Sequence, residues 1–172
     1  MSDDAASIRV GRAADAPLIG AAERAIAQQP GELASRPEEI DDAVLARTIV
    51  ELADGKRGVF LVAEHGGAVV GHAFLEPLPL AVTWHVVRLT IAVHQGHQGQ
   101  GIGRALMHEA LRWARETPTV DKVELQVRST NERAIALYRS LGFIEEGRKT
   151  RRLKVAPGMY LDDIYMALWV GP

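Results

Sequence analysis

Apolar residues along the chain form two kinds of pattern, short runs and helical stripes. The runs are bounded by glycine, proline or polar clusters, which is typical of strands. They predict strands at residues 8–10, 59–63, 68–75, 84–93, 123–127, 143–153 and 161–170. The joint Glu64-His65-Gly66-Gly67 between the second and third runs predicts a tight hairpin.

Apolar positions three or four residues apart predict helices at residues 15–26, 40–52, 102–116 and 131–141. Asp15 is a candidate cap for the first helix, and Ser129 with Glu132 predicts a capping box for the last. Pro77 and Pro79 predict a loop, because prolines cannot join a central ladder. The order β-α-α-β-β-β-α-β-α-β-β predicts one α+β domain over residues 1–172, a mixed central sheet flanked by helices.

Composition and charge narrow the class of protein. The 172 residues are 47% apolar and 24% charged, as in ordinary globular proteins, and the net charge of −2 lacks the basic excess of nucleic-acid partners. With no cysteine, a disulfide framework, a thiolate metal site and a cysteine nucleophile are excluded. The polar start MSDDAAS is unlike a signal peptide, and no apolar run reaches membrane-spanning length. We therefore expect a cytoplasmic protein without nucleic-acid or membrane partners.

A glycine-rich turn lies between the strand that ends near Val93 and the helix predicted from residue 102. Gly96, Gly99, Gly101 and Gly103 fall within eight residues there. Glycines let a ligand approach the backbone closely, and the first N–H groups of a helix attract anions. The segment therefore predicts a phosphate or pyrophosphate site rather than a plain turn.

Other phosphate-binding patterns do not fit this turn. A dinucleotide fingerprint would need its third glycine where Arg104 stands, and GK[ST] of a P-loop is absent. The turn instead resembles the coenzyme A loop of the GNAT superfamily of N-acetyltransferases, [Q/R]-x-x-G-x-[G/A], at Gln98, Gly101 and Gly103.

A second motif follows one strand later. Asn131, Ala134 and Tyr138 share one face of the predicted helix. With Gly142 and Phe143 they match the GNAT pattern N-x-x-A-x-x-L-Y-x-x-x-G-F. Two motifs in family order are more specific than either alone, so the chain resembles a single-domain GNAT-like acyltransferase.

The resemblance implies acetyl-CoA as co-substrate and assigns site residues by position. Backbone groups of Ile91, Ala92 and Val93 would pair with the pantetheine arm as an added strand does. Asn131 would hydrogen-bond the cofactor on the helix face that includes Ala134, and Tyr138 would lie near the sulfur. A tyrosine that only packs in the core stays open as an alternative. Backbone amides would hold the pyrophosphate at Gln98, Gly99, Gln100, Gly101, Ile102, Gly103 and Arg104.

The implied chemistry is direct attack of an amine on the thioester, with Tyr138 donating a proton to the leaving thiolate. Some family members carry a glutamate base where this chain has Val87. His85 is the candidate base here, because histidine titrates near neutrality, although a structural or surface histidine is an equal alternative. Further candidates are Glu76, Glu124, Asp163 and a water relay. His94 and His97 lack a third ligand nearby, so no metal site is expected.

The acceptor is the least determined part of the prediction. Glu76 and Asp163 are candidates for binding an ammonium, and Arg148 or Arg151 for binding a carboxylate. We therefore expect a small-molecule amine or amino acid. A peptide or protein N-terminus, and a non-catalytic domain that binds acyl-CoA, remain alternatives. The sequence leaves the oligomeric state open, including a homodimer.

Overall fold

Seven strands build one mixed sheet in the computed structural model, which describes residues 6–171. The strands follow one another across the sheet in the order β1-β2-β3-β4-β5-β7-β6. Only β4 and β5 are parallel, and every other pair is antiparallel. Residues 1–5, on which the expectation about a signal peptide rests, lie outside the described residues. The strands are β1 (Ser7–Val10), β2 (Val59–His65), β3 (Ala68–Pro77), β4 (Val86–Val93), β5 (Lys122–Arg128), β6 (Ile144–Ala156) and β7 (Met159–Trp169).

Four α-helices complete the predicted order of elements, which is confirmed. They are α1 (Ala16–Ala27), α2 (Asp42–Glu51), α3 (Ile102–Glu116) and α4 (Glu132–Ser140). Short 3-10 turns that the sequence did not predict lie at Ala13–Asp15, Pro37–Glu39 and Ala81–Thr83. None of the helices within residues 6–171 is long and apolar enough to cross a membrane.

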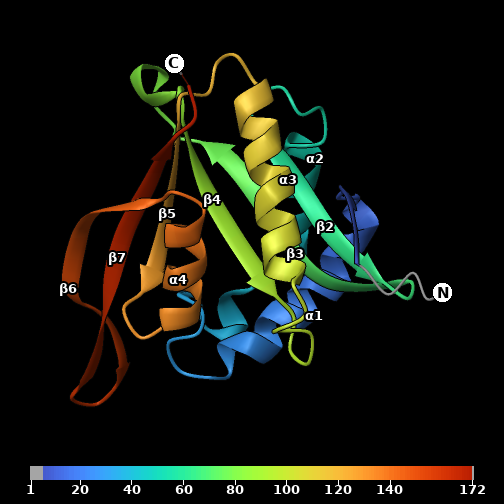
Figure 1. The fold of residues 1–172 in the computed structure, drawn as a ribbon. Helices are drawn as coiled ribbons and strands as arrows, with labels where there is room; N and C mark the ends of the chain where they lie inside the picture. The colour runs from blue at the N-terminus through green and yellow to red at the C-terminus, as the bar shows by residue number, and fades with distance from the viewer. Residues whose placement is uncertain (1–5, 172) are drawn as a thin grey trace.

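Helices cover both faces of the sheet (Figure 1). The α3 and α4 face holds the larger core, in which Leu106, Met107 and Leu111 of α3 are almost fully buried. On the other face, α1 and α2 pack around Phe60 and Val62 of β2. Residues 59–63 of β2 and 70–73 of β3 are buried on both faces, because helices cover both sides of the sheet there, whereas burial alternates along β5.

The two parallel strands separate toward their carboxyl ends. Val86–Arg88 pair with Lys122–Glu124, and the ladder between β4 and β5 stops there. Figure 1 shows the arrowheads of β4 and β5 diverging on either side of α4. From residue 89 to 93, β4 is therefore paired with β3 alone, and its other edge has backbone groups available to a ligand.

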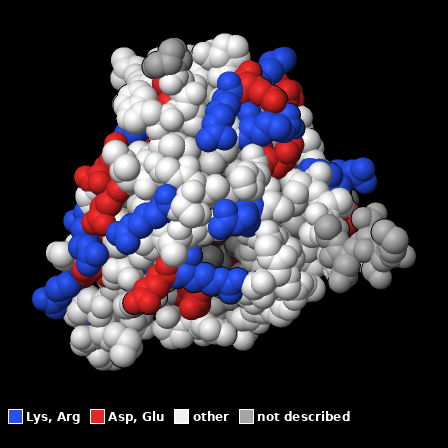
Figure 2. Space-filling model, viewed as in Figure 1, with Lys and Arg blue, Asp and Glu red and all other residues white. Residues whose placement is uncertain are grey.

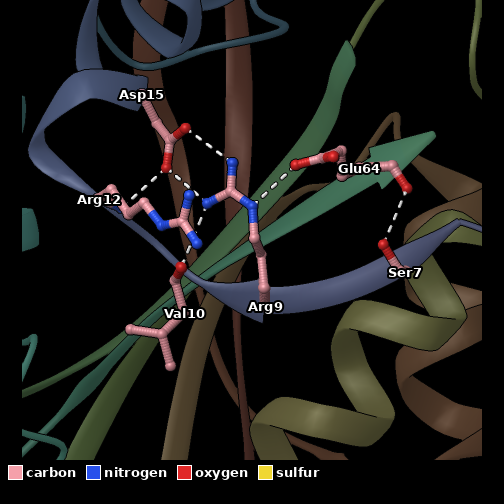
Figure 3. A network of polar contacts seen from close by, with 6 residues as sticks. All are labelled: Ser7, Arg9, Val10, Arg12, Asp15 and Glu64. Atoms are coloured by element: carbon pink, nitrogen blue, oxygen red, sulfur yellow. Dashed lines mark hydrogen bonds and ion pairs between the residues drawn. The ribbon is translucent and has the colours of Figure 1, made fainter. Parts of the chain in front are cut away.

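A polar network ties the first elements together (Figure 3). Nη1 and Nη2 of Arg9 each donate to one oxygen of Asp15 at 2.8 Å, and Nε of Arg9 donates to Glu64 at 2.8 Å. Asp15 also accepts the backbone N–H of Arg12 at 2.7 Å. Asp15 precedes α1 without making the predicted side-chain cap, because its carboxylate is occupied by these contacts.

Candidate active site

The turn between β4 and α3 has the conformation that its glycines allow. Gly96, Gly99 and Gly101 have φ angles of 82°, 86° and 81°, in the left-handed region. Gly101 precedes the first residue of α3, and a Cβ placed on it would meet no atom within 4 Å. The first turn of α3 therefore presents its N–H groups to open space, which is the arrangement that binds anions.

A cavity of about 520 Å³ connects this turn with β4 and α4. Gln100 and Ile102 are the predicted cofactor residues that do not line it. Gln100 donates a side-chain hydrogen bond to the carbonyl of Gly96, and Ile102 is buried in the core. The cavity does bring together the other predicted cofactor residues, Ile91, Ala92, Val93, Gln98, Gly99, Gly101, Gly103, Arg104, Asn131, Ala134 and Tyr138.

Gln98 of the first motif shapes the turn through its side chain. Its Nε2 donates to the carbonyl of Val93 at 3.3 Å, and its Oε1 accepts the N–H of Gly96 at 3.1 Å. Gln98 thus holds the turn against the end of β4. This contact gives a structural reason for a glutamine at that position.

Two arginines flank the turn, and only one of them was predicted. Arg104 of α3 lines the cavity and donates to Ser140 Oγ at 3.4 Å. Arg133 of α4 also lines the cavity, and its Nη2 lies 3.4 Å from the position of a Cβ built on Gly99. Figure 2 shows a hollow between α3 and α4 with basic side chains around its rim. Arg133 follows Asn131 by two residues at a variable position of the motif, so the motif alone could not identify it.

The start of α4 differs from the predicted capping box. The cap is Asn131, whose Oδ1 accepts the N–H of Ala134 at 3.1 Å. The prediction of Ser129 with Glu132 is wrong because α4 begins at Glu132, so Ser129 lies too far upstream to cap it. Asn131 has one oxygen engaged in the cap, and its amide N–H groups remain for a ligand in the cavity.

Tyr138 lines the same cavity from the middle of α4 and is only 7% exposed. Its ring packs against Phe143 at a centroid distance of 5.9 Å. Among the described residues, its hydroxyl has no hydrogen-bond partner. Burial raises the pKa of Tyr138 to about 12, so the phenol stays protonated at neutral pH and can act as a donor.

His85 does not lie where the sequence predicted it. Strand β4 begins at Val86, and His85 is exposed just before it, where its carbonyl accepts the N–H groups of Asp121 and Lys122. Six residues separate His85 from Ile91 in the cavity, roughly 20 Å along extended chain. The structure therefore does not support His85 as the base.

The acids considered as alternatives are already paired. Glu76 accepts from Arg88 at 2.5 Å, Glu124 accepts from Lys122 at 2.9 Å, and Asp163 is buried against Arg128. An exposed acid that does line the cavity is Glu32, in the connection between α1 and α2. Within residues 6–171, no group of three or more His, Asp or Glu side chains is arranged to hold a metal ion.

The groups proposed for a carboxylate clamp lie outside the cavity as well. Arg148 contacts Asp162 at 3.5 Å and Glu145 at 3.9 Å. Arg151 stacks on Tyr160 at 4.2 Å and donates its backbone N–H to Asp162. Both arginines therefore stabilise the hairpin of β6 and β7.

Known proteins share both the sequence pattern and the fold of this chain. N-alpha-acetyltransferase RimI of Mycobacterium tuberculosis is 35% identical over 138 residues, 80% of this chain and 85% of that protein. L-amino acid N-acetyltransferase AaaT of Escherichia coli is 34% identical over 107 residues, 62% of this chain and 65% of that protein.

Solved structures agree with this relationship. The ribosomal-protein-alanine N-acetyltransferase of Brucella melitensis superposes with a TM-score of 0.81 at 30% identity, over 95% of this chain and 99% of that chain. The structure of yncA from Salmonella typhimurium, solved with acetyl-CoA, has the same fold, with a TM-score of 0.86 at 23% identity over 97% and 95% of the two chains. The family model of the acetyltransferase (GNAT) family matches residues 25–143. The chain therefore belongs to the GNAT family of acetyltransferases.

Proposed function

We propose that this protein transfers an acetyl group from acetyl-CoA to the primary amine of a small molecule or amino acid, by direct attack in a ternary complex. The observation that carries the proposal is one cavity that joins the open edge of β4, the glycine turn and Tyr138. As a GNAT acetyltransferase, the protein uses acetyl-CoA as its co-substrate. The alternative of a domain that only binds acyl-CoA predicts no thiol release from acetyl-CoA with any amine.

The residues of the cavity fit coenzyme A. The N–H groups at the start of α3, together with Arg104 and Arg133, would hold the pyrophosphate. The free edge of β4 at 91–93 would pair with the amide groups of the pantetheine arm. The space in front of Gly101, where a Cβ would meet no atom within 4 Å, leaves room for phosphate oxygens. When bound, acetyl-CoA supplies the activated acetyl thioester.

Proton movements are assigned to this chain's own groups. Tyr138 would donate its phenolic proton to the departing thiolate, since it is protonated at neutral pH and lines the cavity. A free N–H near Val93 would stabilise negative charge that develops on the acetyl oxygen. The incoming ammonium must lose a proton before it attacks, and we propose that solvent water receives it, because His85 lies far from the cavity.

The acceptor is proposed to enter beside the connection between α1 and α2. Ile26 at the end of α1 and Glu32 and Leu33 of the connection line the cavity, so an acid and two apolar side chains would meet the entering amine. Gly31 packs against Leu161, with only 2.4 Å between a built Cβ and Cδ1 of Leu161. The last hairpin thereby closes this side, and Glu32 is the proposed partner of the acceptor ammonium.

The test is thiol release from acetyl-CoA across a panel of amines. An amino acid, its amide, a polyamine and short peptides should be compared at saturating acetyl-CoA. A small-molecule acetyltransferase should show its highest kcat/KM with the amino acid or another small amine. Glu32→Gln should raise the KM for the amine without changing the KM for acetyl-CoA. Faster turnover of peptides than of all small amines would contradict the proposal.

A peptide or protein N-terminus is the second candidate acceptor. It is favoured by the 35% identity with the N-alpha-acetyltransferase RimI, which extends over 80% of this chain. Peptides that differ only in their first residue would show selectivity if this candidate is correct. The assignments of one domain to residues 1–172, a cytoplasmic location and a homodimer remain predictions, and light scattering of the purified protein tests the last.

A further inference from the structure

A series of hydrogen-bonded polar side chains connects α1 with β3, outside the groups that the proposed reaction uses, and its two histidines are buried. Glu23 of α1 lies 3.0 Å from Nε2 of His72 on β3, and Nδ1 of His72 lies 3.2 Å from Nε2 of His94. Nδ1 of His94 lies 3.0 Å from the carbonyl of Val69. His72 is 0% exposed and His94 is 6% exposed, so water does not supply alternative partners.

The contacts of this chain require one proton more than two neutral histidines carry. Each of the three hydrogen bonds needs one hydrogen, and each neutral imidazole supplies one. The carbonyl of Val69 only accepts, so His94 must donate from Nδ1. The third hydrogen must be an additional proton shared among Glu23, His72 and His94, which makes the trio neutral as a whole.

The additional proton is shared by Glu23 and His72. Burial lowers the pKa of His94 to about 4, so His94 is neutral over the physiological range and accepts from His72 at Nε2. The titratable groups that act on His94 are His72, Glu23 and His97 of the following turn. From β2, the neighbour is the apolar ring of Phe60, which stacks on His72. The proton therefore resides between Glu23 and His72.

His94 connects these hydrogen-bonded side chains to the glycine turn. It follows Val93 of the cavity directly, and its backbone N–H donates to the carbonyl of Val70 at 2.9 Å. Its carbonyl accepts the N–H of His97 at 3.1 Å. The next residue, Gln95, donates from its side chain to the carbonyl of Ala25 on α1 at 3.2 Å. The turn is thus anchored on β3 and α1 at its first two residues.

We propose that Glu23, His72 and His94 are positioning residues that hold the coenzyme A turn in its binding conformation through one shared proton. The proposal rests on the placement of coenzyme A at the turn. Without this proton, two lone pairs face each other between His72 and His94, which weakens the anchor. Fixed turn amides bind an anion better than mobile ones, so coenzyme A affinity falls when the anchor loosens.

Glu23→Gln is the variant that separates the shared proton from packing. The glutamine amide can donate to Nε2 of neutral His72, and all three hydrogen bonds are then satisfied without the additional proton. Calorimetric titration with coenzyme A between pH 6 and pH 9 should show the wild-type affinity falling about threefold to tenfold relative to the variant, the effect of one lost hydrogen bond. Titration of the coenzyme A phosphates contributes equally to both proteins and cancels in the ratio.

Glu51→Gln, at an exposed position at the end of α2, makes the same charge change away from these three side chains and should keep the wild-type pH profile. Nitrogen-15 NMR of the histidine rings provides a second readout and should show His94 protonated at Nδ1 only. Parallel pH profiles for wild type and Glu23→Gln, or a proton on Nε2 of His94 at neutral pH, would overturn the proposal. If the wild type fails to bind coenzyme A at all, the placement of the cofactor and the positioning role both fall, while the ring spectra still decide the proton chain.

Discussion

Tyr138 lines the cavity with a side chain that is almost completely buried. We predict that Tyr138→Phe lowers kcat by about 10²- to 10⁴-fold, the usual range for loss of a general acid. The affinity for acetyl-CoA should stay nearly unchanged, because the ring and its contact with Phe143 are retained. Steady-state kinetics at saturating amine, together with calorimetry, measure the two quantities separately.

A wild-type rate in this variant, under conditions where chemistry limits turnover, would show that Tyr138 contributes only by packing. The pH profile provides a control on the same residue. Since burial raises the pKa of Tyr138 to about 12, the wild-type rate should not fall on the alkaline side through loss of this proton below about that pH.

The sequence predicted some residues of the site correctly and missed others. Motif residues such as Asn131 and Tyr138 do line the cavity, because motif spacing on a helix fixes which face they share. Arg133 was missed because its position in the motif is variable. His72 was missed because its partners, Glu23 and His94, come from distant segments. Its presence inside an apolar run was the one available signal, since a buried histidine needs a partner.

The turn between β4 and α3 can be tested as an element. Gly101→Val should abolish detectable coenzyme A binding, because a branched side chain would fill the open space in front of α3 and resist a φ of 81°. Calorimetry measures the binding, and thermal unfolding shows whether the fold survives. Gly147→Val in exposed β6 is the matched control, since a Cβ there also meets no atom within 4 Å and its φ is not in the left-handed region. Unchanged affinity in a folded Gly101→Val protein would contradict the site.

The junction of β1, β2 and α1 depends on the charge of Asp15. Hydrogen bonds from Arg9 lower the pKa of Asp15 below its ordinary value. A lowered carboxyl pKa contributes stability above about pH 4, the unfolded value, and this stability is lost as the pH falls through the folded value. Asp15→Asn should therefore reduce the free energy of unfolding by roughly 1–2 kcal/mol at pH 7, with allowance for the partial exposure of Arg9.

The difference between Asp15→Asn and wild type should shrink on acidification below about pH 4. Urea unfolding at pH 7 and near pH 3 measures it, with the exposed Glu51→Gln variant as control for loss of one carboxylate. A constant difference at both pH values would show that Asp15 acts through shape and not through charge.

The order of the elements could be predicted from local sequence patterns, whereas the ends of the strands depend on pairing with neighbouring strands. The apolar runs and stripes predicted all seven strands and four helices in order. Trp84 was assigned to a strand, but it ends a 3-10 turn, because β4 starts only where Val86 finds its partner Lys122. The hairpin of β6 and β7 is longer than predicted because polar β6 is exposed and lacks an apolar signal. The separation of β4 from β5 depends on register across the sheet, which no local pattern reveals.

At the scale of the whole molecule, the two substrates are assigned to different segments of the chain. The proposed cofactor side is built from β4, α3 and α4. The proposed acceptor side uses the connection between α1 and α2 together with the last hairpin, where Gly31 meets Leu161. Substitutions in the acceptor segments should therefore change amine selectivity while leaving the KM for acetyl-CoA nearly constant.

Because the ladder between β4 and β5 is incomplete, the sheet of the free protein also has an open edge in its interior. The N–H groups of Ile91 and Val93 face this open edge, where another extended chain could bind them, as at any bare edge strand. Acetyl-CoA in its proposed position would act as a removable strand, so the amides of Ile91 and Val93 should exchange with deuterium faster in the free protein than with coenzyme A bound. At a ligand concentration of 100 times Kd, the gain in unfolding free energy is about 2.7 kcal/mol. Deuterium exchange that is slow and unchanged by the ligand would contradict this role. If the edge is bare in the free protein, we also expect the enzyme to aggregate when it is stored without its co-substrate.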